Sequence, residues 1–228
     1  MTIADLDATF AALAEVPELT IVGQQAPRVQ WWEPDDFAAE LAGLDDAAVV
    51  RALGVAAAWL ELPLHVDLQW EAELDPRDGR PVGQLGGLHM RSLLDAWARR
   101  DDPDWQAPAG PDGARYFLID IDNYHGNGDF TVAVIDDAGL HLEYCDGKEF
   151  TRLAVTPLEF CRVGIEALGW PAWQRLFAAD RSRDPAEFER AYLRPMCEAL
   201  PRWLPHGERS ALEAAIAAWR RRNARSAG

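Results

Sequence analysis

Residues 115–160 carry the clearest structural pattern in this sequence and read RYFLIDIDNYHGNGDFTVAVIDDAGLHLEYCDGKEFTRLAVTPLEF. Aromatic and β-branched residues dominate 115–121, 130–135 and 140–145, and runs of this length and composition are typical of β-strands. Glycine-containing turns separate the runs, and Gly139 is free to adopt a positive φ angle in a tight hairpin. We therefore expect three consecutive antiparallel strands, with residues 150–155 leading out of the sheet.

A helix start follows these strands directly. Thr156 supplies an N-cap hydroxyl, Pro157 suits the first helical position, and Glu159 can bond back to the cap. The pattern predicts a helix over residues 157–168. Strands joined by short turns and closed by a capped helix indicate an α+β fold, in which helices cover an antiparallel β-meander.

Helices are also expected on both sides of this segment. Apolar spacing predicts a helix over residues 2–15, with further N-terminal helices over 35–44 and 45–53. Another is expected over 88–100, after a break at Gly86 and Gly87. The region from 169 to 228 is predicted to be all-helical. We expect an α+β core domain over 1–168 and a helical extension over 169–228, packed together as a single compact unit.

Residues 65–74 show the plainest alternation in the chain. Val66, Leu68, Trp70, Ala72 and Leu74 alternate with His65, Asp67, Gln69, Glu71 and Glu73. A period of two predicts a strand with one buried face and one acidic, solvent-facing face. Two interpretations of the acidic row remain open: protection of a sheet edge against unwanted pairing, or a surface that binds a partner.

Two adjacent tryptophans, Trp31 and Trp32, invite the same choice between structure and binding. Neighbouring residues face different directions in regular structure, so we expect one indole to be buried and the other exposed. They are either aromatics of the core and its rim or anchors for a partner. With Asp67, Glu71 and Glu73 they are the candidate partner-binding residues.

Composition limits the classes of function. The chain has 228 residues and a net charge of −16, which opposes direct nucleic-acid binding and favours a basic protein partner. No apolar run is long enough to span a membrane, and the acidic N-terminus does not resemble a signal peptide. The three cysteines are widely spaced, and we expect them to be buried thiols in a cytoplasmic protein. The oligomeric state is not predicted.

One polar cluster could carry chemistry: Asp120, Asp122, Asn123, His125, Asn127 and Asp129. The acids at alternate positions resemble part of a calcium loop, but Tyr124 and Thr131 occupy positions that should be ligands. Turn chemistry is one interpretation, and a metal site of a hydrolase using Asp120, Asp122, His125 and Asp129 is the alternative. Since no nucleophile elbow, phosphate-binding loop or zinc-protease motif is present, we expect no enzyme and no cofactor.

Several of these features together resemble the SMI1/KNR4 (SUKH) superfamily over about residues 50–168. The resemblance is carried by Trp105, Gly113, the strand end at 119–122, the turn at 126–128, Val132 and residues 157–160. It implies an α+β fold without catalysis that binds protein partners. Bacterial members are commonly immunity proteins that neutralise secreted toxins, often nucleases. An acidic surface suits that role, because a nuclease cleft is basic and complementary fields speed association.

Overall fold

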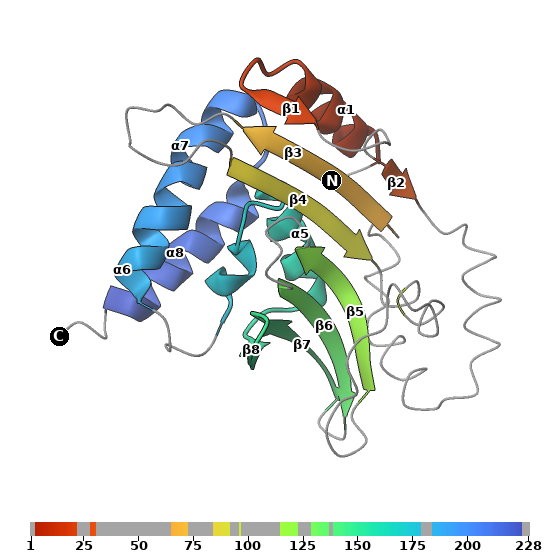
Figure 1. Ribbon diagram of the computed structural model, residues 1–228, viewed down its shortest axis with the longest axis vertical. Helices are drawn as coiled ribbons and strands as arrows, with labels where there is room; N and C mark the ends of the chain where they lie inside the picture. Colours follow the sequence, from red (N-terminus) through yellow and green to blue (C-terminus); the bar gives the residue numbers. More distant parts are fainter. Residues whose placement is uncertain are drawn as a thin grey trace.

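The computed structural model describes residues 3–21, 28–30, 65–72, 84–91, 96, 115–122, 129–136, 139–178 and 184–224. These residues form an open antiparallel sheet in the order β1-β3-β4-β5-β6-β7-β8, with β2 also paired to β3 (Figure 1). The strands are β1 (Leu19–Ile21), β2 (Arg28–Gln30), β3 (His65–Ala72), β4 (Gln84–Arg91), β5 (Arg115–Asp122), β6 (Asp129–Asp136), β7 (Gly139–Cys145) and β8 (Phe150–Leu153). The helical segments are α1 (Ile3–Ala14), α5 (Pro157–Glu166), η5 (Trp173–Leu176), α6 (Pro185–Phe188), η6 (Glu189–Leu193), α7 (Arg194–Trp203) and α8 (Ser210–Ala224). The predicted α+β class is confirmed.

The meander from β5 to β8 forms as its residues predict. Gly139 closes the β6–β7 hairpin with a φ angle of 106°. The Thr156 hydroxyl accepts a hydrogen bond of 3.3 Å from the Glu159 backbone, and Pro157 opens α5. Local turn and capping chemistry therefore agrees with the tertiary structure along this segment.

The alternation in β3 is confirmed on its apolar side, and the edge interpretation of its polar side is wrong. Val66, Leu68, Trp70 and Ala72 are all buried, and Glu71 is exposed. However, β3 is paired on both sides, with β4 along one and with β1 and β2 along the other. An interior strand needs no protection against edge pairing, so that explanation of the acidic row does not hold.

The helix expected over residues 88–100 is wrong over its first turn, because β4 extends to Arg91. Gly86 and Gly87 do not interrupt the strand: they lie within it, opposite Trp70 and Gln69. A Cβ atom at Gly86 would lie 2.1 Å from Cζ2 of Trp70, so only glycine leaves room for the indole. Gly87 donates a backbone hydrogen bond to the Gly169 carbonyl at 3.1 Å. The two glycines allow close packing of the strand. The sequence alone does not distinguish this role from a turn that ends the strand.

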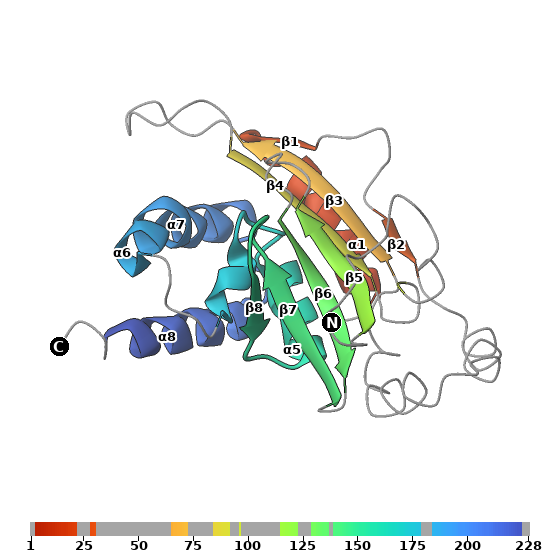
Figure 2. The ribbon, with the colours of Figure 1, turned by 60° about the horizontal axis from the view of Figure 1, so that its bottom comes forward.

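One face of the sheet, called here the helix face, packs against α5, η5, α7 and α8 (Figure 2). An aromatic cluster on this face joins Trp70 of β3 to Trp170 and to Trp203 of α7, with ring centroids 5.2–5.6 Å apart. The Trp70 indole also donates to the Leu168 carbonyl at 2.7 Å. A single hydrophobic cluster thus includes both the sheet and the helices after residue 168.

The opposite side, called here the second face, carries a smaller apolar cluster of Leu118, Val132 and Val134. A register shift between Leu118 and Asp120 interrupts the alternation of β5. Because of this bulge, Ile119 and Asp120 both face the helix side, where Asp120 contacts η5. The second face is therefore lined from β5 by Tyr116 and Leu118.

Candidate functional site

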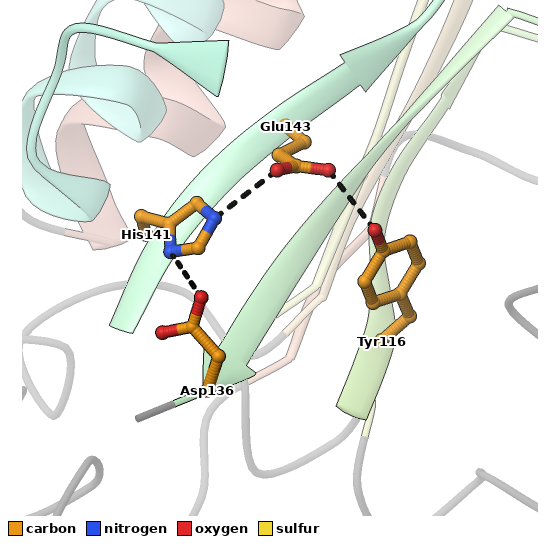
Figure 3. A network of polar contacts seen from close by, with 4 residues as sticks. All are labelled: Tyr116, Asp136, His141 and Glu143. Atoms are coloured by element: carbon orange, nitrogen blue, oxygen red, sulfur yellow. Dashed lines mark hydrogen bonds and ion pairs between the residues drawn. The ribbon is translucent and has the colours of Figure 1, made fainter. Parts of the chain in front are cut away.

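The second face carries a network of four polar side chains from three adjacent strands (Figure 3). The Tyr116 hydroxyl donates to Oε2 of Glu143 at 3.2 Å, and Nε2 of His141 lies 3.1 Å from Oε1 of the same carboxylate. Nδ1 of His141 lies 4.0 Å from Oδ2 of Asp136. We call Tyr116, Asp136, His141 and Glu143 the second-face network.

Strand register explains why these four residues meet. Val134 pairs with Tyr116 on one side and with His141 on the other, so the three residues form a row across β5, β6 and β7. Glu143 lies two residues beyond His141 on the same face, because alternate residues of a strand share a face. The tyrosine therefore reaches across the β6 valines to a carboxylate that histidine orients from the other side.

Aromatic side chains border the network. Phe150 of β8 is 40% exposed, and it is the large hydrophobic residue of the described chain with the most exposed surface. Its ring packs edge-on against Tyr116 at 5.2 Å and Phe130 at 5.8 Å between centroids. An exposed ring that packs against Tyr116, whose hydroxyl binds Glu143, can contact the alkyl stem of a basic side chain.

The electrostatics of the network keep the Tyr116 phenol protonated. Burial, followed by the negative charge of Glu143, raises the pKa of the Tyr116 phenol above its ordinary value. The phenol therefore stays protonated at neutral pH and continues to donate to Glu143. Two bonds hold this carboxylate in place at low entropic cost, which prepares it to receive a cationic group.

Two of the predicted metal ligands, Asp120 and Asp129, accept hydrogen bonds from other side chains. Asp120 is 1% exposed and accepts a hydrogen bond of 2.7 Å from the Gln174 side chain. Asp129 accepts from the Tyr144 hydroxyl at 2.6 Å and pairs in register with Asp122. His125 and the Asp122 side chain lie outside the described residues. Within the described part of the chain, no three histidine, cysteine or acidic side chains gather closely enough to hold a metal ion.

Most predicted partner-binding residues cannot be compared with the structure. Trp31, Trp32, Glu73 and the Asp67 side chain lie outside the described residues. Glu71 is exposed on the second face of β3, as expected. Its row is less uniformly exposed than predicted, because Gln69 is half-buried against His89 at 3.0 Å.

The prediction that all three cysteines are buried is wrong for Cys197. Cys145 and Cys161 are buried, whereas Cys197 on α7 is exposed. Burial, followed by the nearby Asp120 carboxylate, raises the pKa of the Cys161 thiol far above its ordinary value. A thiol that stays protonated is a poor nucleophile, so Cys161 belongs to the core.

Sequence reasoning missed the second-face network, although one signal was available. His141 and Glu143 occupy alternate positions of a predicted strand that is otherwise apolar, and alternate residues must share a face. Finding Tyr116 and Phe150 would additionally require the register of four strands.

The protein therefore has an α+β fold with an open antiparallel sheet. Helices cover one face of the sheet, and the other face carries the carboxylate–histidine–tyrosine network. No protein-family model matches the chain, and no similar protein is found among curated proteins or solved structures. None of the described helices is long and apolar enough to cross a membrane.

Proposed function

We propose that this protein is a non-enzymatic, acidic protein-binding module whose partner is a basic protein. In its sharpest form it is a cytoplasmic immunity-type protein that neutralises a basic toxin such as a nuclease. The observation that carries this proposal is the exposed Phe150 ring packed against Tyr116 of the second-face network, on a chain with a net charge of −16. The partial resemblance to the SMI1/KNR4 superfamily supports the same class of function.

The physical argument concerns both affinity and rate. Binding energy concentrates in a few aromatic anchors surrounded by polar groups, and Phe150 with Tyr116 has that arrangement. Asp136, at the rim of the network, and the overall negative charge attract a basic partner before contact. A basic side chain placed over Phe150 would meet a carboxylate that is already oriented.

The experiment measures association with basic proteins, taking first those encoded beside the gene. We expect Phe150→Ala to weaken the dissociation constant by about tenfold or more, as loss of an anchor does. Asp136→Lys should slow association and flatten its dependence on salt. Glu198→Lys, the same charge change at an exposed position on α7, is the matched control and should behave like the wild type.

Two results would overturn the proposal. One is the absence of measurable binding to any basic partner at low salt, where electrostatic attraction is strongest. The other is a partner that binds both second-face variants as tightly as it binds the wild type. Thermal unfolding of each variant shows whether weaker binding comes from a lost contact with the partner or from a destabilised fold.

The alternative function is a metal-dependent hydrolase using Asp120, Asp122, His125 and Asp129. One observation favours it, the cross-strand pairing of Asp122 with Asp129. The bond between Asp120 and Gln174 opposes it, since coordination would compete with that bond. Elemental analysis of chelator-free protein is the test: a near-stoichiometric metal that raises the melting temperature supports this function. Metal-free protein with no response to calcium or zinc excludes it.

A further inference from the structure

A second concave site lies on the helix face, where the meander meets η5 and η6. It is a half-open cavity of about 240 Å³, lined among others by Asp129, Tyr144, Lys148, Arg175 and Tyr192. Cavities that take drug-sized ligands are roughly 300–1,000 Å³, so this one suits a smaller molecule. The second-face network lies on the other side of the sheet, and the proposed function does not involve this cavity.

The cations of the cavity are available for a ligand. Arg175 stacks over the Phe188 ring at 4.6 Å, a contact that orients the guanidinium plane without using its N–H groups. Lys148, the only lysine in the sequence, follows the tight turn made by Asp146 and is exposed. Within the described residues, neither side chain forms an ion pair with an acid. Two positive groups therefore line the cavity, and neither is held in an ion pair by a described acid.

The anionic side of the cavity is equally well placed. Tyr144 donates to Oδ2 of Asp129 at 2.6 Å, which fixes the carboxylate and leaves its other oxygen able to accept. Asp146 adds a second negative charge at the turn. The lining thus carries two positive and two negative groups. A simple anion would meet repulsion from both aspartates and from a chain of net charge −16.

The geometry points to a binding site for a small zwitterion of the α-amino-acid class. Its carboxylate would be received by Arg175 and Lys148, and its ammonium group by Asp129. The Tyr144 and Tyr192 side chains line the remainder of the cavity and provide a partly apolar contact for the ligand's side chain. A ligand with both charges satisfies each pole of the lining, which a carboxylate alone or an amine alone does not.

The experiment titrates the full chain with each of the twenty L-α-amino acids, using thermal shift and then calorimetry, with EDTA throughout. We expect at least one amino acid to stabilise the protein saturably. The same molecule without its ammonium group, or without its carboxylate, should bind at least about tenfold more weakly, as loss of a charge-assisted hydrogen bond predicts.

Variants test which residue binds the carboxylate of the amino acid and which binds its ammonium group. Arg175→Met keeps an unbranched stem against Phe188 and should weaken binding at least about tenfold. Asp129→Asn should remove most of the preference for the amino acid over its analogue without the ammonium group. Arg194→Gln removes an exposed arginine outside the cavity, on α7, and should bind like the wild type.

Three results overturn this inference: no saturable response to any amino acid, equal binding of the carboxylate-only analogue, or unchanged binding by Arg175→Met. Phe150→Ala, which tests the protein-binding proposal, should leave amino-acid binding unchanged. Failure of one proposal is therefore distinguishable from failure of the other.

Discussion

At the scale of single residues, Gly86 is a position where the fold leaves no room for a side chain. Its missing side chain accommodates the Trp70 indole, and an added Cβ would lie 2.1–2.7 Å from three indole atoms. Such an overlap forces a shift of backbone or ring, and overpacking of this kind costs about 1–3 kcal/mol or more. We expect Gly86→Ala to lower the free energy of unfolding in urea by at least that amount.

The Trp70→Phe variant provides the control for this prediction. A smaller ring relieves the overlap, so Gly86→Ala should cost less in the Trp70→Phe background than in the wild type. The coupling energy of the double-mutant cycle is then favourable. An identical cost in both backgrounds would show that strand propensity, and not the indole, explains the effect.

Glu166 gives a prediction for pH dependence. Its carboxylate, only 7% exposed, accepts the backbone N–H of Leu212 at 2.8 Å and so caps α8 from α5. Burial is the main cause that raises the pKa of this carboxyl above its ordinary value of 4.5. The native state therefore holds a proton over a range where the unfolded chain has lost it. Stability from this group is present below pH 4.5 and is lost as pH rises through the raised value.

Two substitutions separate the charge from the cap. Glu166→Gln keeps an oxygen that can accept from Leu212 and carries no proton to lose, so the fall in stability above pH 4.5 should shrink. Glu166→Ala removes the acceptor and should cost about 1 kcal/mol, the usual effect of losing an N-cap. Urea unfolding at a series of pH values measures both, and parallel profiles for wild type and Glu166→Gln would contradict the assignment.

At the scale of secondary-structure elements, β3 joins the buried core to the second face, where Glu71 is exposed. Since β3 is paired on both sides, charge changes in its polar row leave the sheet edges unaltered. We expect Glu71→Lys with Glu73→Lys to leave the free energy of unfolding within about 0.5 kcal/mol. If a basic partner approaches this face, the double variant should associate more slowly, with a flatter salt dependence. Unchanged association kinetics would exclude the polar row of β3 from the docking surface.

The elements differ in how far sequence alone predicts them. The β5–β8 meander and the start of α5 were predictable because period-two patterning, a hairpin glycine and a Thr-Pro cap all agree locally. Asp184 likewise caps α6 as its sequence indicates, accepting from the Ala186 backbone at 2.9 Å. By contrast, the part of β4 over residues 86–91 was missed, because Gly86 makes room for Trp70, a residue sixteen positions away. The local strand propensity of residues 86–91 does not depend on such a distant contact and therefore cannot predict it.

The candidate site was likewise predictable only where its residues are close in sequence. The acidic residues 120–129 form a cluster in the sequence, yet a bulge in β5 places Asp120 in the interior against Gln174. The second-face network depends on the pairing of three strands, and the cavity lined by Asp129 and Arg175 additionally requires η5 and η6 to meet the meander. Strand register and the packing of helices that are distant in sequence bring these residues together. Such sites can be found from the fold but not from a sequence motif.

At the scale of the whole molecule, the question is whether the helices after residue 168 are an appendage or part of the core. The Trp70, Trp170 and Trp203 cluster joins sheet and helices, and all three rings are at most 4% exposed. Arg220 of α8 forms an ion pair with Glu189 of η6 at 2.6 Å, but this pair lies within the helical part and does not join it to the sheet. The aromatic contact is a buried link between the two parts, beside the hydrogen bond from Gln174 to Asp120.

The final prediction follows from this link. Trp203→Ala removes a buried indole from a cluster shared by β3 and α7, and such truncations cost about 3–5 kcal/mol. If sheet and helices unfold as one unit, helical circular dichroism and exchange of the β6 and β7 amides should report the same loss. Arg202→Ala, an exposed neighbour on α7, is the control and should change stability by less than about 0.5 kcal/mol. Loss of helix with unchanged protection of β6 and β7 would instead show that the C-terminal helices unfold independently of the sheet.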